Sequence, residues 1–139
     1  MNQIACESLD PIMTPLVNKF YQQHNVRGRA KSHDKVWLIK IDNQIAATAK
    51  LTLKEEHYLL TGVFTVPLHR GKNLASQLIK HISSYYQLPI YTFAYSHLVD
   101  WYTRCAFHLS EPPPELQSIF QAYVRQGRDI RCMVTNLEL

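Results

Sequence analysis

The chain has 139 residues, of which 46% are hydrophobic, and it carries a formal net charge of +4. This length suits one hydrophobic core, so we predict a single domain over residues 1–139, and the apolar content excludes a disordered chain. No apolar run approaches the roughly 18 residues of a membrane span, and the first ten residues lack a signal-peptide pattern, so we expect a cytoplasmic location.

Cysteine and histidine spacing gives no sign of a disulfide framework or a metal site. Cys6, Cys105 and Cys132 are odd in number and form no CxxC pair, so reduced thiols are expected. The seven histidines include no pair or cluster with the spacing of zinc ligands, and we therefore expect no metal.

The first half of the chain predicts one helix and three strands. The helix spans residues 10–24, with Asp10 as its N-cap and Pro11 as its first helical residue. A basic loop follows over residues 25–34. Strands over 35–41, 45–53 and 58–67 are joined by short turns, which indicates an antiparallel meander. Gly62 is expected to mark a bulge or a close backbone approach in the third strand.

The second half alternates helices and strands. Residues 73–86 have the apolar stripe of a helix packed on a sheet. Residues 88–94 form an apolar run typical of a strand parallel to its neighbour. A short helix over 98–106 capped by Ser96, a brief strand at 107–109, a helix over 114–126 ending at Gly127 and a strand over 129–139 complete the order. The pattern indicates an α/β (α+β) fold, a mixed sheet covered by helices.

The turn before the helix at residues 73–86 has the features of an anion site. Arg70 and Lys72 flank Gly71 just where the helix begins. A helix N-terminus carries partial positive charge and N–H groups without carbonyl partners, and glycine lets a ligand approach the backbone. Ala75 is small enough for the same approach. A phosphate or diphosphate is the predicted ligand, and a plain solvated turn is the alternative.

Two motifs resemble those of the GNAT-type N-acetyltransferases. Residues 70–75 read Arg-Gly-Lys-Asn-Leu-Ala, similar to the family's acetyl-CoA-binding motif R/Q-x-x-G-x-G/A. Asn73 replaces the first glycine, but asparagine tolerates left-handed backbone angles. Residues 102–107 resemble a Tyr-x-x-x-Gly-Phe ending, with Ala106 in place of glycine. The resemblance covers residues 58–109, and the family's first strand is expected to be short or missing near residues 2–7.

This resemblance implies a single-domain GNAT-like fold. Its sheet would be mixed, mostly antiparallel, flanked by helices and splayed at the cofactor cleft. Acetyl-CoA would be the co-substrate, with no metal. The pantetheine arm would pair with the main chain of Val63, Phe64 and Thr65, where an N–H can polarise the thioester carbonyl. The remaining cofactor-binding residues would be Arg70, Gly71, Lys72, Asn73, Leu74, Ala75 and Ser76, with the diphosphate on the amides of 71–76.

The resemblance also implies direct attack of an amine on the thioester, N-acetylation of a primary amine. Tyr102 matches the family's tyrosine acid, which protonates the leaving thiolate. The base is open, because residues 58–67 and 88–94 contain no carboxylate. His97 is the first candidate, and Glu55, Glu56, His57 or a water chain are the others.

The acceptor is predicted to be a small-molecule or peptide amine. Arg27 and Arg29 in the basic loop are expected to bind an anionic part of it, and a solvated loop is the alternative. Two other functions stay open: a catalytically silent CoA-binding regulatory module, and an acetyltransferase acting on a nucleic-acid-associated substrate. No membrane partner is expected and nucleic-acid binding is disfavoured. The sequence identifies neither the acceptor nor the oligomeric state, which leaves a homodimer open.

Overall fold

A computed structural model describes residues 4–86 and 88–135. Its residues form two compact units, Met1–Thr52 with Thr61–Tyr85, and Leu53–Leu60 with Tyr86–Leu139. We describe each unit by itself, and the single domain over 1–139 stays a prediction. The strands form a seven-stranded mixed sheet in the order β1-β2-β3-β4-β5-β7-β6, with β4 running from one unit into the other.

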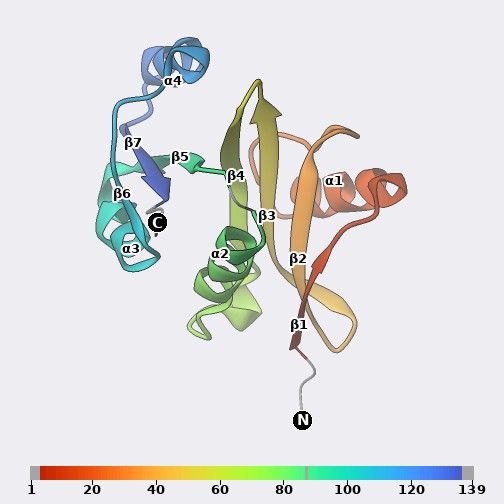
Figure 1. The fold of residues 1–139 in the computed structure, drawn as a ribbon. Helices are drawn as coiled ribbons and strands as arrows, with labels where there is room; N and C mark the ends of the chain where they lie inside the picture. The colour runs from red at the N-terminus through yellow and green to blue at the C-terminus, as the bar shows by residue number, and fades with distance from the viewer. Residues whose placement is uncertain (1–3, 87, 136–139) are drawn as a thin grey trace. The chain divides into compact units, whose positions relative to one another are not determined.

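The first unit begins with three antiparallel strands (Figure 1). They are β1 (Ile4–Ser8), β2 (Lys35–Ile41) and β3 (Gln44–Lys54), followed by β4 (His57–Thr65). Asp42 and Asn43 join β2 to β3 with φ of 51° and 68°. Positive φ at both central residues gives the two-residue hairpin whose twist matches the flanking strands. The predicted meander is confirmed.

Two helices of the first unit contact opposite faces of β2. In α1 (Thr14–Gln23), Val17 and Phe20 belong to the same buried cluster as Val36 and Leu38. Between those two strand residues, Trp37 points the other way, and its ring lies 5.2 Å from His81 of α2 (Leu74–Tyr85). Side chains alternate between the faces of a strand, so this sequence supplies apolar contacts on both faces.

The predicted first helix is divided into a 3₁₀ turn and an α-helix, and Gly62 in the middle of β4 is left-handed. A 3₁₀ turn, η1 (Pro11–Met13), precedes α1, and the carboxylate of Asp10 accepts the Ile12 N–H at 3.1 Å. Asp10 therefore caps η1, whereas α1 itself begins later than predicted, at Thr14, and its N-cap residue Met13 makes no side-chain hydrogen bond. Gly62 has φ +64° within β4, the left-handed conformation expected of a glycine at a bulge.

The second unit places helices on β5 (Ile90–Tyr95) and its neighbours. Leu59 of β4 is in parallel register with Tyr91, and β7 (Ile130–Thr135) pairs antiparallel with both β5 and β6 (Phe107–Leu109). The Phe93 ring lies 5.1 Å from Phe120 of α4 (Pro114–Arg125). The short helix α3 (Val99–Arg104) leads directly into β6.

Several expectations need correction or lie outside the described residues. The first strand, expected to be short or missing, is present and short: all five residues of β1 pair with β2. Ser96 does not cap α3. It begins a 3₁₀ turn, η3 (Ser96–Leu98), and its hydroxyl donates to Asp129 Oδ1 at 2.8 Å. The end of the predicted last strand, residues 136–139, lies outside the described residues, as do residues 1–3. The predicted splay at the cofactor cleft stays a prediction.

Among the described residues, no helix has the length and apolar character needed to cross a membrane.

Replacing Ala106 with glycine is expected to stabilise the fold. Ala106 is exposed and has φ +69°, a conformation that costs an L-residue about 1–2 kcal/mol but costs glycine little. After the entropy that glycine adds to the unfolded chain, we expect a gain of about 0.5–1 kcal/mol in the free energy of unfolding, measured in urea. The same exchange at Ala122, inside α4, should destabilise by about 1 kcal/mol. If both glycine variants were less stable than the parent, the prediction would be contradicted.

Candidate active site

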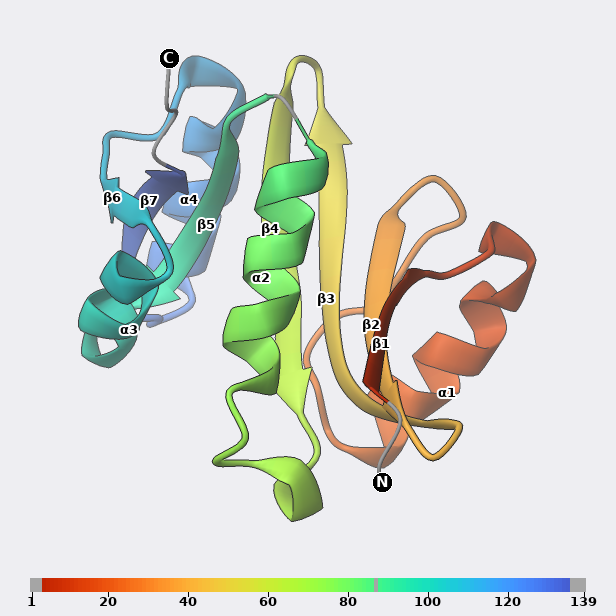
Figure 2. The same cartoon turned by 60° about the horizontal axis from the view of Figure 1, so that its bottom comes forward.

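The anion site predicted from the sequence is a sharply bent turn at the start of α2. After β4 the chain makes a 3₁₀ turn, η2 (Pro67–His69), and then bends through Gly71 at φ +87° and Asn73 at φ +59°. Figure 2 shows α2 following this turn. Asn73 thus adopts the left-handed conformation expected for the family's glycine, and its carbonyl accepts the Gln77 N–H at 3.0 Å. We call residues 70–76 the crook.

The crook supplies positive charge without a competing carboxylate. The first turn of α2 contains no acidic residue, and Arg70, Gly71, Lys72 and Asn73 are all exposed. The N–H groups of a first helical turn have no carbonyl partner within the helix and carry the positive end of its dipole. An anion in contact with this turn would therefore be stabilised by both the backbone and the two cationic side chains.

Side chains fix the crook from both ends. Arg70 Nε donates to the Thr65 carbonyl at 3.0 Å, which ties the crook to the end of β4. Gln77 Nε2 donates to the Lys72 carbonyl at 3.3 Å, and Lys72 Nζ lies 2.8 Å from His69 Nδ1. The Arg70 guanidinium is predicted to contact the ligand. It uses one N–H group to bond the Thr65 carbonyl, and its other N–H groups can still donate to a ligand.

The strand segment Val63, Phe64 and Thr65 is half-buried. The Phe64 ring turns toward α1, 6.0 Å from Phe20 and 5.3 Å from His24, and the Arg70 guanidinium lies 5.5 Å above it. Packing of the Phe64 side chain therefore fixes the backbone that is predicted to pair with pantetheine. The Thr65 carbonyl has a second lone pair that Arg70 does not use.

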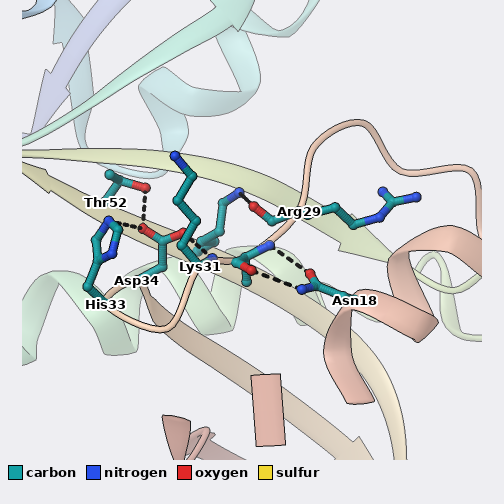
Figure 3. Close-up of polar contacts among 8 residues, drawn as sticks. Asn18, Arg29, Lys31, His33, Asp34 and Thr52 are labelled. Atoms are coloured by element: carbon teal, nitrogen blue, oxygen red, sulfur yellow. Dashed lines mark hydrogen bonds and ion pairs between the residues drawn. The ribbon is translucent and has the colours of Figure 1, made fainter. Parts of the chain in front are cut away.

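The basic loop over residues 25–34 is held in place by side chains from its surroundings (Figure 3). Asn18 of α1 bonds both main-chain groups of Ala30, accepting its N–H at 2.7 Å and donating to its carbonyl at 2.9 Å. Asp34 accepts the Lys31 N–H at 2.8 Å and the Thr52 hydroxyl at 2.9 Å. The loop is therefore an ordered part of the first unit.

Arg27 and Arg29, predicted to bind the acceptor, are both exposed. The Arg29 guanidinium donates to the carbonyls of Val26 and Gly28 at 3.1 and 2.6 Å, so it stiffens its own loop. Its main-chain carbonyl accepts from Lys50 Nζ at 2.9 Å. Burial lowers the pKa of Lys50, an effect that the nearby Asp34 carboxylate opposes. The acceptor-binding role of the two arginines stays a prediction.

Tyr102 lies in the second unit, near the middle of α3. It is 7% exposed, and its ring packs against Trp101 and Phe107. Burial raises the pKa of Tyr102 to about 12, despite the Thr92 hydroxyl beside it. Tyr102 therefore stays protonated across the physiological range and can donate a hydrogen bond.

The candidate bases in the second unit differ in their surroundings. His97 is exposed and stacks on Tyr95 at 6.0 Å. His57 is held by an ion pair, with Nε2 3.1 Å from Oε2 of Glu115 in α4, and its ring lies 5.6 Å from Tyr91. The assignment of the base to His97, like that of the acid to Tyr102, stays a prediction.

Comparison with known proteins reveals the family. The model of the acetyltransferase (GNAT) family matches residues 5–107, about three quarters of the chain. The chain belongs to the GNAT family. No curated protein sequence matches it.

Solved GNAT-like structures share the fold at low sequence identity. A GNAT-family acetyltransferase from Streptococcus pneumoniae aligns with a TM-score of 0.72 at 11% identity, covering 98% of this chain and 100% of the other. An acyl-CoA N-acyltransferase from Pseudomonas aeruginosa gives 0.67 at 15%, covering 96% and 100%. N-acetylglutamate synthase from Neisseria gonorrhoeae, complexed with coenzyme A and N-acetyl-glutamate, gives 0.67 at 15%. The chain spans only 36% of that protein's length, although all of this chain is covered.

The two residues that differ from the GNAT motifs both have left-handed backbone conformations. Asn73 and Ala106 take the places of glycines and have positive φ, so the backbone keeps the conformation that glycine would adopt there. The cost is local strain, larger for alanine than for asparagine.

Sequence reasoning missed several polar residues of the first unit, most of which hold the basic loop. Asn18, Asp34 and Lys50 hold the loop, and Tyr21 lies beside Gly62. All four of these side chains are buried or half-buried. In the sequence, the only sign of these roles was a polar residue among apolar neighbours.

The GNAT fold is expected to lose stability in alkaline solution. Burial raises the pKa of Cys132 from 9.0 to about 12 and that of Tyr102 from 10.0 to about 12. The folded state therefore keeps protons that the unfolded state releases, so this stability is present below pH 9 and is lost as the pH rises toward 12. Urea unfolding between pH 8 and 11 should show the decline. Cys132→Ala should flatten it between pH 9 and 10, and an unchanged slope there would contradict the assignment to Cys132.

Proposed function

We propose that this chain transfers an acetyl group from acetyl-CoA to the primary amine of an acceptor by direct attack. The observation that carries the proposal is the crook, where Gly71 and Asn73 bend the chain into the start of a helix that has no acidic residue in its first turn. Membership of the GNAT family supports acetyl-CoA as the donor. The acceptor is unidentified.

In this proposal the diphosphate of acetyl-CoA lies on the crook, and pantetheine pairs with the main chain of Val63, Phe64 and Thr65. A main-chain N–H of that segment polarises the thioester carbonyl. The uncharged amine forms a C–N bond to the carbonyl carbon and the C–S bond breaks. His97 accepts the proton that the nitrogen releases, and the departing thiolate takes its proton from water. Arg27 and Arg29 attract an anionic part of the acceptor.

Tyr102 serves the leaving thiolate chiefly as a hydrogen-bond donor. Burial raises the pKa of Tyr102 to about 12, above the roughly 8.5 of a free thiol, so full transfer of its proton to the thiolate is unfavourable. A hydrogen bond to the thiolate gains stabilisation without that cost. His97 is the proposed base.

A catalytically silent CoA-binding module is the second candidate. It is favoured by the high pKa of Tyr102 and by the absence of carboxylates from residues 58–67 and 88–94. Binding of acetyl-CoA without turnover of any amine would support it. The cytoplasmic location stays a prediction that rests on sequence composition.

Thermal shift and calorimetry test the proposal directly. Acetyl-CoA and CoA at 100 times their dissociation constant should each stabilise the fold by about 2.7 kcal/mol. Pantetheine, which lacks the diphosphate, is the matched control and should bind far more weakly. A panel of amines is then screened by thiol release. No binding of either coenzyme would refute the proposal.

A further inference from the structure

A groove in the first unit lies outside the crook and is bounded by three elements. It is walled by α1, by the start of β3 and by η2. Its volume is about 570 Å³, within the range of pockets that hold small molecules. We call it the α1 groove, after the residues of that helix that line it: Leu16, Lys19, Phe20 and Gln23.

The α1 groove leaves large apolar side chains exposed to water. Leu16 is 50% exposed and Leu68 is 81% exposed. Phe20, by contrast, is buried and belongs to the core cluster, against which Ile45 and Val66 also pack. The groove thus joins exposed apolar side chains to the edge of the core. A ligand with an apolar body would remove this surface from water, which is favourable.

The polar side chains that line the α1 groove favour an anion. Among the described residues these are lysine, histidine and glutamine side chains, and none is a carboxylate. Lys72 Nζ lies 2.8 Å from Nδ1 of His69, which lines the groove. An ammonium can only donate, so Nδ1 accepts and the ring proton of neutral His69 is on Nε2, as a donor for a ligand.

Helix geometry gathers the other donors on α1. Lys19 and Gln23 are four residues apart, which places them on the same face of the helix. His24 follows at the end of α1, and its ring is fixed at 4.6 Å from Phe20 and 5.3 Å from Phe64. A ligand with one anionic end can therefore meet several donors from a single helix.

We propose that the α1 groove binds a small amphipathic carboxylate, with a flat apolar body and one anionic group. The apolar body covers Leu16 and Leu68, and the carboxylate pairs with Lys19. A free small molecule is favoured over a protein segment because the volume is that of a ligand pocket. The inference is independent of acetyl transfer, since it concerns a place on the chain other than the crook.

A fluorescent carboxylate and its neutral analogue test the ligand class. The probe is 2-naphthoate, and the analogue of the same shape is 2-naphthamide, each titrated by fluorescence anisotropy against the full chain. Naphthoate should bind about fivefold or more tightly than naphthamide, because only the carboxylate forms a charge-assisted bond with Lys19. Saturating coenzyme A should leave naphthoate bound.

Three variants place the probe in the α1 groove. Lys19→Gln should weaken naphthoate about fivefold and leave naphthamide unchanged. Lys35→Gln is the matched control, because it makes the same change in net charge at an exposed position on β2, and it should alter either affinity by less than about twofold. Leu16→Glu adds a carboxylate to the apolar wall and should abolish naphthoate binding. Its melting temperature should match that of the parent, because Leu16 is half exposed.

Four results would overturn the inference. Naphthoate might as well be uncharged if naphthamide bound equally tightly, and no groove would be involved if Lys19→Gln and Lys35→Gln caused equal losses. Displacement of naphthoate by coenzyme A would place the probe at the coenzyme site. A dimer seen by sedimentation, and dispersed by Leu16→Glu, would mean that a second copy of the chain covers the groove.

Discussion

Replacing Ala75 with glutamate is expected to reduce acetyl-CoA affinity at least 100-fold while leaving the fold intact. Ala75 is half-buried in the first turn of α2. At a separation of about 5 Å and an effective dielectric constant near 20, repulsion between this carboxylate and a diphosphate bound at the crook would cost about 3 kcal/mol. The same carboxylate is compatible with the helix dipole, so the apo protein should be no less stable.

Calorimetry at fixed ionic strength measures this loss, since salt screens the repulsion. Lys80→Gln is the matched control, because it makes the same change of one unit in net charge at an exposed position of the same helix. It should alter the affinity by less than about threefold if general electrostatics are minor. Equal losses in the two variants would show that net charge, and not the crook, governs binding.

Replacing Tyr102 with phenylalanine is expected to slow turnover roughly 100-fold, the usual size of effect when one donor to a developing negative charge is lost. The affinity for acetyl-CoA should stay nearly constant, because the thiolate exists only after the bond breaks. The aromatic packing against Trp101 and Phe107 is retained by the phenyl ring.

For Tyr102→Phe, kinetics measures turnover and calorimetry measures acetyl-CoA affinity on the same preparation. Trp101→Phe is a suitable control, since it alters the neighbouring ring without removing the Tyr102 hydroxyl, and it should change kcat by far less. Equal turnover of Tyr102→Phe and the parent would remove Tyr102 from the mechanism.

Most of the fold follows from patterns local in sequence. The apolar run of β2, the alternation of β3 and the apolar stripe of α2 predicted these elements nearly to the residue. Gly62 and Asn73 could be predicted to be left-handed because the residue type itself indicates it. The resemblance led us to expect β1 to be short or missing. It is short, and its pairing with β2 reveals it.

The candidate site was predictable where it depends on the backbone and not where it depends on distant side chains. The crook lies within one sequence motif. By contrast, Tyr21 and Gly62 are far apart in sequence, as are His57 and Glu115. The pKa of Tyr102 depends on burial by packed neighbours. No spacing rule relates such positions, because tertiary packing brings them together.

The anchoring of Ala30 by Asn18 has a consequence for molecular recognition. Both main-chain groups of Ala30 are bonded, so the segment behind Arg27 and Arg29 is ordered before any partner arrives. When a molecule binds there, the loop loses little conformational entropy, because folding has already ordered it. Discrimination between partners would then depend on fit to a preformed shape, and bulky variants of a good partner should be rejected rather than accommodated.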